Sequence, residues 1–198
     1  IIMKNFEKEE KYFNLVNQIL NCKDCELYKY RNRVVPGEGN INAKIMLIGL
    51  GPGKEEDKQG RPFVGAAGKF LDELLKIVEI ERKDVYITNV VKCYPPNNQP
   101  SENSIIKCAK YLDAQLSLIN PKIIITLGEL ATREIFRRFK LKFTSMSNLH
   151  GKVFEVDSIY GKKKIIVMFH PASALYNAAL KETIIEDWKK IKNILHEE

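Results

Sequence analysis

A chain of 198 residues is long enough for one full hydrophobic core but short for two, so we expect a single domain over residues 1–198. No apolar run is long enough for a membrane helix or resembles a signal peptide, which favours a soluble, cytoplasmic protein. The net charge of +7 suits a phosphate-rich partner or an ordinary solvated surface, because Lys and Glu are mixed along the chain. Frequent Lys, Glu and Ile residues are also compatible with a thermophilic prokaryotic source.

The predicted elements alternate between helices and strands. Apolar side chains at helical spacing predict a first helix over about residues 6–20. Short runs rich in Ile and Val then predict buried strands at residues 44–49, 84–91, 122–128 and 163–169, with a further strand near 153–156. Helical patterns lie between them, and a last helix is expected at about 181–195. This order predicts an α/β fold, a three-layer αβα sandwich with a central, mostly parallel four-stranded sheet.

Unusual residues lie at or just after the end of each of these four strands. The turn Gly49–Gly53 follows the first strand, Asn89 lies near the end of the second, Gly128 ends the third and His170 follows the fourth. The carboxyl ends of parallel strands meet at one edge of a sheet, where ligands usually bind. We therefore expect one site to gather these residues.

Four cysteines, Cys22, Cys25, Cys93 and Cys108, are all that the sequence contains. Intracellular proteins seldom form disulfides, so four thiols favour a metal centre. A zinc ribbon would usually pair one CxxC with a second, whereas the wide spacing of the later two cysteines favours a [4Fe–4S] cluster. Zinc and four buried structural thiols are the alternatives.

The glycine-rich turn after the first strand does not predict a nucleotide cofactor. Pro52 interrupts the GxGxxG pattern, and no acidic residue ends a matching second strand. Further on, the small residues Gly65–Gly68 open a helix and would let a phosphate approach backbone N–H groups.

Six motifs in this order resemble those of the family 4, or type a, uracil-DNA glycosylases, which are iron–sulfur enzymes. They are CxxC at Cys22 and Cys25, the turn from Gly49 to Asp57, GRPFVGxAG from Gly60 to Gly68, ITNVVKC from Ile87 to Cys93, the later Cys108, and FHPA from Phe169 to Ala172. The resemblance spans nearly the whole chain. It implies a base-excision repair enzyme that flips uracil out of DNA and hydrolyses its N-glycosidic bond, with the four cysteines as cluster ligands.

The resemblance also implies roles for three residues. Phe63 would stack on the flipped base, and the side-chain amide of Asn89 would read the edge of uracil that distinguishes it from cytosine. His170 would donate a hydrogen bond to the departing base, in either a neutral or a charged form. The alternative roles are a core aromatic for Phe63, a strand-end cap for Asn89 and a structural histidine for His170.

Contacts to DNA are expected around this pocket. The loop from His170 to Tyr176 resembles the family's minor-groove segment, with Leu175 as a wedge or as a buried core residue. Candidate phosphate or backbone contacts are Arg61, Gly65, Lys92, His150 and Ser173. Uracil-containing DNA is the expected partner, replication or repair proteins such as a sliding clamp are further candidates, and a monomer is the simplest expectation.

One position departs from the family pattern. Leu50 stands where the family usually has a glutamate that contacts the base or organises the attacking water, and leucine there is similar to the related family 5, or type b, enzymes. We therefore expect Glu56, or else Asp57, to position the water with backbone groups of Gly51. Weaker or broader activity is also expected. A lesion-binding protein without turnover is the alternative, and an electron-transfer or zinc-stabilised interaction protein is a third.

Overall fold

One mixed sheet of six strands organises the protein. The computed structural model describes residues 2–197, with side chains from residue 6 onward. The strands are β1 (Glu38–Gly39), β2 (Ile45–Gly49), β3 (Tyr86–Asn89), β4 (Ile123–Leu127), β5 (Val153–Ser158) and β6 (Gly161–Met168). Their order across the sheet is β1-β3-β2-β4-β6-β5. Neighbours among β3, β2, β4 and β6 are parallel, while the edge strands β1 and β5 are antiparallel to the strands they join.

The four predicted strands form the parallel centre of this sheet, and the predicted segment near residue 153 is the edge strand β5. The two-residue strand β1 was not predicted, because it is too short to carry an alternating pattern. Strand β3 ends at Asn89, two residues before the apolar run does. The next two amides, of Val90 and Val91, still donate to the carbonyls of Gly49 and Leu50, which keeps the chain beside the end of β2.

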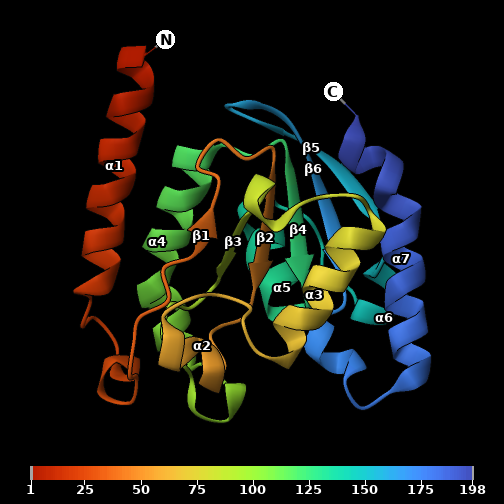
Figure 1. Ribbon diagram of the computed structural model, residues 1–198, viewed down its shortest axis with the longest axis horizontal. Coiled ribbons are helices and arrows are strands. Elements are labelled where there is room, and N and C mark those ends of the chain that lie inside the picture. The colour runs from red at the N-terminus through yellow and green to blue at the C-terminus, as the bar shows by residue number, and fades with distance from the viewer. Residues whose placement is uncertain (1, 198) are drawn as a thin grey trace.

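Helices cover both faces of the sheet, as expected for a three-layer sandwich (Figure 1). They are α1 (Ile2–Leu20), α2 (Lys54–Gln59), α3 (Ala66–Ile77), α4 (Glu102–Ile119), α5 (Glu129–Arg138), α6 (Met146–Leu149) and α7 (Ala178–His196). Residues of α1, α4 and α5 share one core with one face of the sheet, and residues of α3 and α7 share a second core with the other face. Within residues 2–197, none of the helices has the length and apolar character that crossing a bilayer would require.

The central strands alternate their side chains between these two cores. In β2, Met46 and Ile48 belong to the first core, whereas Ile45 and Leu47 belong to the second. Strand side chains point to opposite faces in turn, so a continuous apolar run is what a sheet buried on both faces requires.

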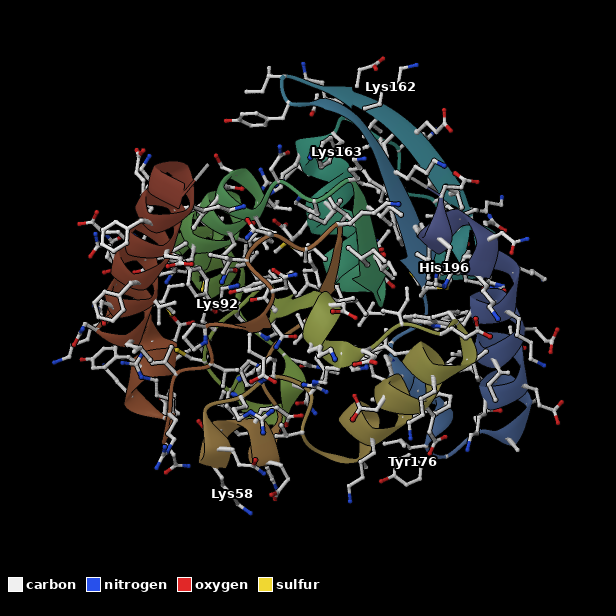
Figure 2. All side chains as sticks on the ribbon, turned by 45° about the horizontal axis from the view of Figure 1, so that its top comes forward. Lys58, Lys92, Lys162, Lys163, Tyr176 and His196 are labelled. Carbon is white, nitrogen blue, oxygen red and sulfur yellow. The ribbon has the colours of Figure 1, made fainter. Side chains whose placement is uncertain are left out.

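The loops that follow the parallel strands gather at one end of the molecule. Lys58 in α2 and the exposed Tyr176 both lie at this end, and Lys162 and Lys163 of β6 lie at the opposite end (Figure 2). The glycine-rich turn after β2, the end of β3 and the segment after β6 therefore face a common space.

Candidate active site

A cavity of about 600 Å³ opens at the carboxyl ends of the strands. It is lined by segments that follow β2, β3 and β6 and by the start of α3. Eight residues singled out from the sequence line it, namely Leu50, Gly51, Glu56, Phe63, Gly65, Asn89, His170 and Leu175. Gly128 is not among the lining residues; a Cβ atom there would lie 3.1 Å from the Cβ of His170, so Gly128 packs behind that residue.

Asn89 lines this cavity and carries a buried amide oxygen without a partner among the described residues. Its side chain is buried, with 2% of its surface exposed, and its Oδ1 atom has no hydrogen-bond partner among the described residues. Gly49 makes room for it, because a Cβ atom at Gly49 would lie 2.6 Å from Oδ1. Buried polar atoms in proteins are nearly always hydrogen-bonded, so this oxygen is well suited to accept a hydrogen bond from a bound molecule.

His170 presents a neutral imidazole to the same cavity. Its Nδ1 atom accepts a hydrogen bond from the backbone N–H of Ala172 at 3.0 Å. Burial lowers the pKa of His170 to about 4, so the ring is neutral at pH 7. In a neutral imidazole whose Nδ1 is an acceptor, Nε2 carries the proton. The ring therefore offers one N–H donor.

Phe63 stacks against His170. The two ring centroids lie 5.6 Å apart with an angle of 26° between the planes. The backbone of Phe63 has a φ of 49°, in the left-handed region that side chains other than glycine rarely adopt. Gly68 allows the chain to pack closely here, since a Cβ atom there would lie 1.9 Å from the carbonyl oxygen of Phe63.

The two adjacent carboxylates of α2 point to different surroundings. Glu56 lines the cavity, and its Oε1 atom accepts hydrogen bonds from the amides of Val64 and Gly65, each at 3.2 Å. Asp57 lies outside the cavity lining, and both its oxygens accept hydrogen bonds from Asn32. Asp57 therefore holds a neighbouring loop, and Glu56 is the carboxylate within reach of a ligand.

Two expected phosphate contacts are corrected by the structure. Lys92 is fully buried, and its ammonium donates to Thr88 Oγ1, the Asn89 carbonyl and Gln115 Oε1, so it does not reach a phosphate on the surface (Figure 2). At the start of α3, the Glu56 carboxylate takes the N–H of Gly65 that had been expected to face a phosphate. A sequence cannot distinguish such a buried lysine from the many exposed ones.

The remaining expected DNA contacts are Arg61, His150 and Ser173, and the side chain of each already contacts another group of the protein. Arg61 forms a two-pronged ion pair with Glu38, with bonds of 2.8 and 3.0 Å. His150 lies outside the cavity lining, with its Nδ1 atom 2.6 Å from an oxygen of Asp187. Ser173 donates its hydroxyl to the carbonyl of His170 at 2.6 Å, which stabilises the turn after β6.

Leu175 and Tyr176 form an exposed apolar rim of the cavity. Leu175 is 40% exposed and Tyr176 is 97% exposed, and both line the cavity. The alternative of Leu175 as a buried core residue is therefore wrong. The sequence marks Tyr176 only as the end of this segment, and nothing in it predicts that Tyr176 lies on this rim.

The four cysteines line a second, smaller cavity on the α1 and α4 side of the sheet. All four are free thiols, and Arg31 donates to Cys93 Sγ at 3.2 Å. Burial raises the pKa of Cys25 and Cys93, and it raises that of Cys108 to about 11. Over residues 2–197, however, no three His, Cys, Asp or Glu side chains are positioned to hold a metal ion.

A family model and the sequences of known relatives agree with one another. Residues 36–192 match the Uracil DNA glycosylase superfamily. The chain is 46% identical over 183 residues to a type-4 uracil-DNA glycosylase of Archaeoglobus fulgidus, which covers 92% of each chain. It is 48% identical over 181 residues to a type-4 uracil-DNA glycosylase of Sulfurisphaera tokodaii, covering 89% of this chain and 81% of the relative. A type-5 uracil-DNA glycosylase of Pyrobaculum aerophilum is more distant, at 28% identity over 81% of this chain and 82% of its own.

Proposed function

The chain belongs to the type-4 uracil-DNA glycosylases, and from that membership we propose how its cavity carries out the reaction. The protein is a base-excision repair enzyme that hydrolyses the N-glycosidic bond of uracil in DNA. The reaction takes place in the cavity lined by Phe63, Asn89 and His170. The observation that carries this proposal is that Asn89, whose buried Oδ1 has no partner among the described residues, lines the same cavity as a neutral histidine donor.

Recognition begins when the nucleotide turns out of the DNA stack. A base within a duplex cannot be attacked at its glycosidic bond, so the enzyme must flip it into a pocket. Phe63 then stacks on the ring, and Asn89 Oδ1 accepts the N3–H of uracil. Cytosine has no N–H at that position, so the same oxygen discriminates against it. Leu175, exposed on the rim, fills the space left in the DNA.

Bond cleavage places negative charge on the departing uracil. The Nε2–H of His170 donates to its O2 atom, and a donor aimed at developing charge typically contributes about 10²- to 10³-fold in rate. Because the hydrogen bond from Ala172 fixes the proton on Nε2, the donor is the neutral imidazole. No proton transfer from His170 is needed for this role.

Glu56 positions the attacking water. Its Oε1 atom is held by two backbone amides, which leaves Oε2 to accept a hydrogen bond from water. We expect Glu56→Gln to slow single-turnover excision about ten-fold or more, because glutamine keeps an oxygen for the two amides but loses the charge. The measurement is rapid-quench excision on a uracil-containing oligonucleotide. An unchanged rate with the variant would remove Glu56 from the mechanism.

A [4Fe–4S] cluster held by the four cysteines is the cofactor that we propose for the second cavity. The chemistry of the donor set suits a cluster, because four free cysteines line one cavity together with Arg31, Lys92 and Lys107, although their thiols do not converge as a metal site over residues 2–197. When bound, the cluster would join the segment after α1, the segment after β3 and α4. Absorbance at about 400 nm would support the cluster, and a colourless protein with stoichiometric zinc would support the alternative.

The test of function is release of bases from DNA. Purified protein is incubated with oligonucleotides that carry uracil, thymine, hypoxanthine or xanthine, and hot alkali then cleaves any abasic site. Strand scission at uracil is expected. Scission at other bases would agree with the broader activity expected from Leu50, whose side chain offers the cavity no polar group. Binding without scission would instead favour a lesion-binding protein.

We infer one domain that acts on uracil-containing DNA, since all six strands form one sheet with a core on each face. Type-4 relatives from Archaeoglobus fulgidus and Sulfurisphaera tokodaii support the expected prokaryotic source. A sliding-clamp partner, a monomeric state and a cytoplasmic location stay predictions.

A further inference from the structure

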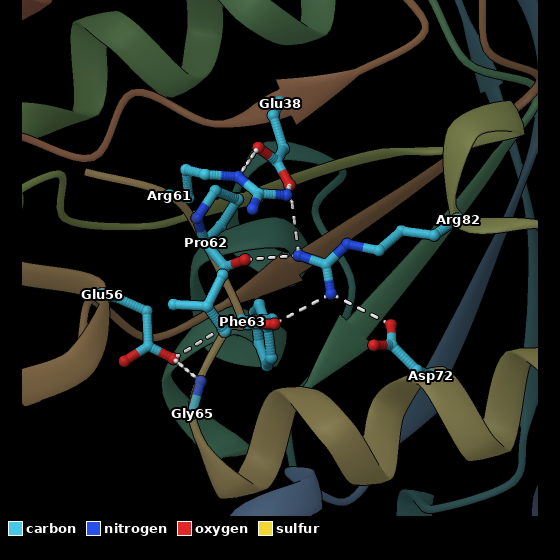
Figure 3. Close-up of polar contacts among 9 residues, drawn as sticks. Glu38, Glu56, Arg61, Pro62, Phe63, Gly65, Asp72 and Arg82 are labelled. Atoms are coloured by element: carbon cyan, nitrogen blue, oxygen red, sulfur yellow. Dashed lines mark hydrogen bonds and ion pairs between the residues drawn. The ribbon is translucent and has the colours of Figure 1, made fainter. Parts of the chain in front are cut away.

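The loop that carries Phe63 is held in a conformation that it would not adopt by itself. It joins α2 to α3, and Phe63 sits there with a φ of 49°. A left-handed backbone at a residue other than glycine costs about 1 kcal/mol or more, so neighbouring groups must hold it. Figure 3 shows which groups do so.

Arg82 holds this loop from one side. Its Nη1 atom donates to the carbonyl of Phe63 at 2.8 Å, and its Nη2 atom donates to the carbonyl of Pro62 (Figure 3). From the other side, the Glu56 carboxylate accepts the amides of Val64 and Gly65. A cation thus binds two consecutive carbonyls and an anion binds the next two amides, so Phe63 is fixed between opposite charges.

The guanidinium of Arg82 is itself held in place. Asp72 accepts from Nη1 at 3.0 Å, and Glu38 accepts from Nη2 at 3.3 Å (Figure 3). Burial alone would raise the pKa of the Glu38 carboxyl, but hydrogen bonds and charges from Arg61 and Arg82 lower it overall. The Arg82 side chain is only 24% exposed, and partial removal from water strengthens such contacts.

Arg82 is not among the residues that line the cavity, and of its four partners only Phe63 is a lining residue, which makes Phe63 the most direct route to the ligand. The fit around that ring leaves little freedom. A Cβ atom at Gly49 would lie 2.7 Å from Phe63 Cζ, and the ring lies against His170 on another side. A small rotation of the loop would therefore move the stacking surface relative to both Asn89 and His170.

We propose that Arg82 is a positioning residue that sets the Phe63 ring for stacking on the everted base. This inference rests on the proposed function of the cavity. A forked guanidinium is required, because two carbonyls and two carboxylates surround it and a lysine ammonium cannot match that planar arrangement. Arg82 precedes β3 in an ordinary charged segment, outside every motif noted in the sequence.

The test is a double-mutant cycle between Arg82 and Phe63. The readouts are KM and kcat for excision and the inhibition constant of free uracil. We expect Arg82→Gln to raise KM and the uracil inhibition constant about ten-fold, with a smaller change in kcat, because the stacking surface is misplaced. In a Phe63→Ala background, the same Arg82 substitution should change neither constant more than about two-fold.

Two further variants keep the result unambiguous. Arg82→Lys retains the positive charge and replaces Arg82→Gln if that variant does not fold. We expect the lysine variant to recover less than half of the loss in uracil affinity, measured as the logarithm of the inhibition constant. Arg138→Gln is the matched control, since Arg138 also joins two carboxylates and two backbone carbonyls in a site 12% exposed, but neither lines the cavity nor contacts Phe63. It should lower the melting temperature and leave the uracil inhibition constant unchanged.

Different results would contradict the proposal for Arg82 and the proposed function. If Arg82→Gln or Arg82→Lys binds uracil as the wild type does, or if the full effect persists without the Phe63 ring, the proposal for Arg82 is wrong while the function stands. If the wild-type protein releases no uracil from DNA, the proposed function itself fails.

Discussion

Asn89 and Lys92 lie three residues apart and both are buried, yet they differ in whether their side-chain polar atoms have hydrogen-bond partners. The ammonium of Lys92 has three acceptors, at 2.6 to 2.7 Å, so its donors are fully used inside the protein. The amide oxygen of Asn89 has no partner among the described residues, and Asn89 lines the cavity. Buried polar groups stabilise a fold only when they are paired, so the unpaired oxygen is kept for a ligand and the paired ammonium for the structure.

Removing the Asn89 amide should give the largest effect. We expect it to lower activity without lowering stability. We expect Asn89→Leu to lower kcat/KM for uracil excision by about 10²-fold or more, because the polar edge of uracil then meets an apolar wall. The free energy of unfolding should stay the same or rise slightly, since an unpaired buried oxygen is lost. Steady-state excision kinetics and guanidinium unfolding measure the two quantities. A large loss of stability would show that Asn89 is structural after all.

Removing the Lys92 ammonium should have the reverse pattern. We expect Lys92→Met to reduce the free energy of unfolding by about 2–4 kcal/mol, because Gln115 Oε1 and the Asn89 carbonyl lose their donor. Guanidinium unfolding measures the change. Lys189→Met is the control, since that lysine is exposed and pairs only with Glu186 on the same helix. Equal stabilities of the two variants would contradict the structural role given to Lys92.

The pH dependence of stability should show a smaller effect from His170. Burial lowers the pKa of His170 to about 4 in the folded protein, whereas its ordinary value is 6.5. As pH falls from 6.5 towards 4, the unfolded chain binds a proton that the folded protein does not. The free energy of unfolding should therefore fall in this range, by at most about 3 kcal/mol.

The variant His170→Gln removes the titrating group and should flatten that dependence. Guanidinium unfolding of both proteins at several pH values between 6.5 and 4 provides the measurement. Parallel curves for wild type and variant would mean that His170 is not held neutral in the folded state.

The sequence determined the architecture and the principal cavity residues of this protein. Its Ile- and Val-rich runs required a sheet buried on both faces, and the chemistry of Asn89 and His170 lay where such strands end. It could not separate Glu56 from Asp57, since adjacent residues on a helix point about 100° apart and only packing decides which one faces the cavity. The same limit hid Lys92, whose three acceptors come from β3 and α4.

Arg82 shows most plainly what only the tertiary structure decided. Its contacts with Pro62, Phe63, Asp72 and Glu38 join β1, the loop before α3, α3 itself and the segment before β3. Local patterns report what a residue does to its own helix or strand, because periodicity and capping act over a few positions. A contact between distant segments exists only once the sheet has brought them together, so no spacing along the chain could have predicted it.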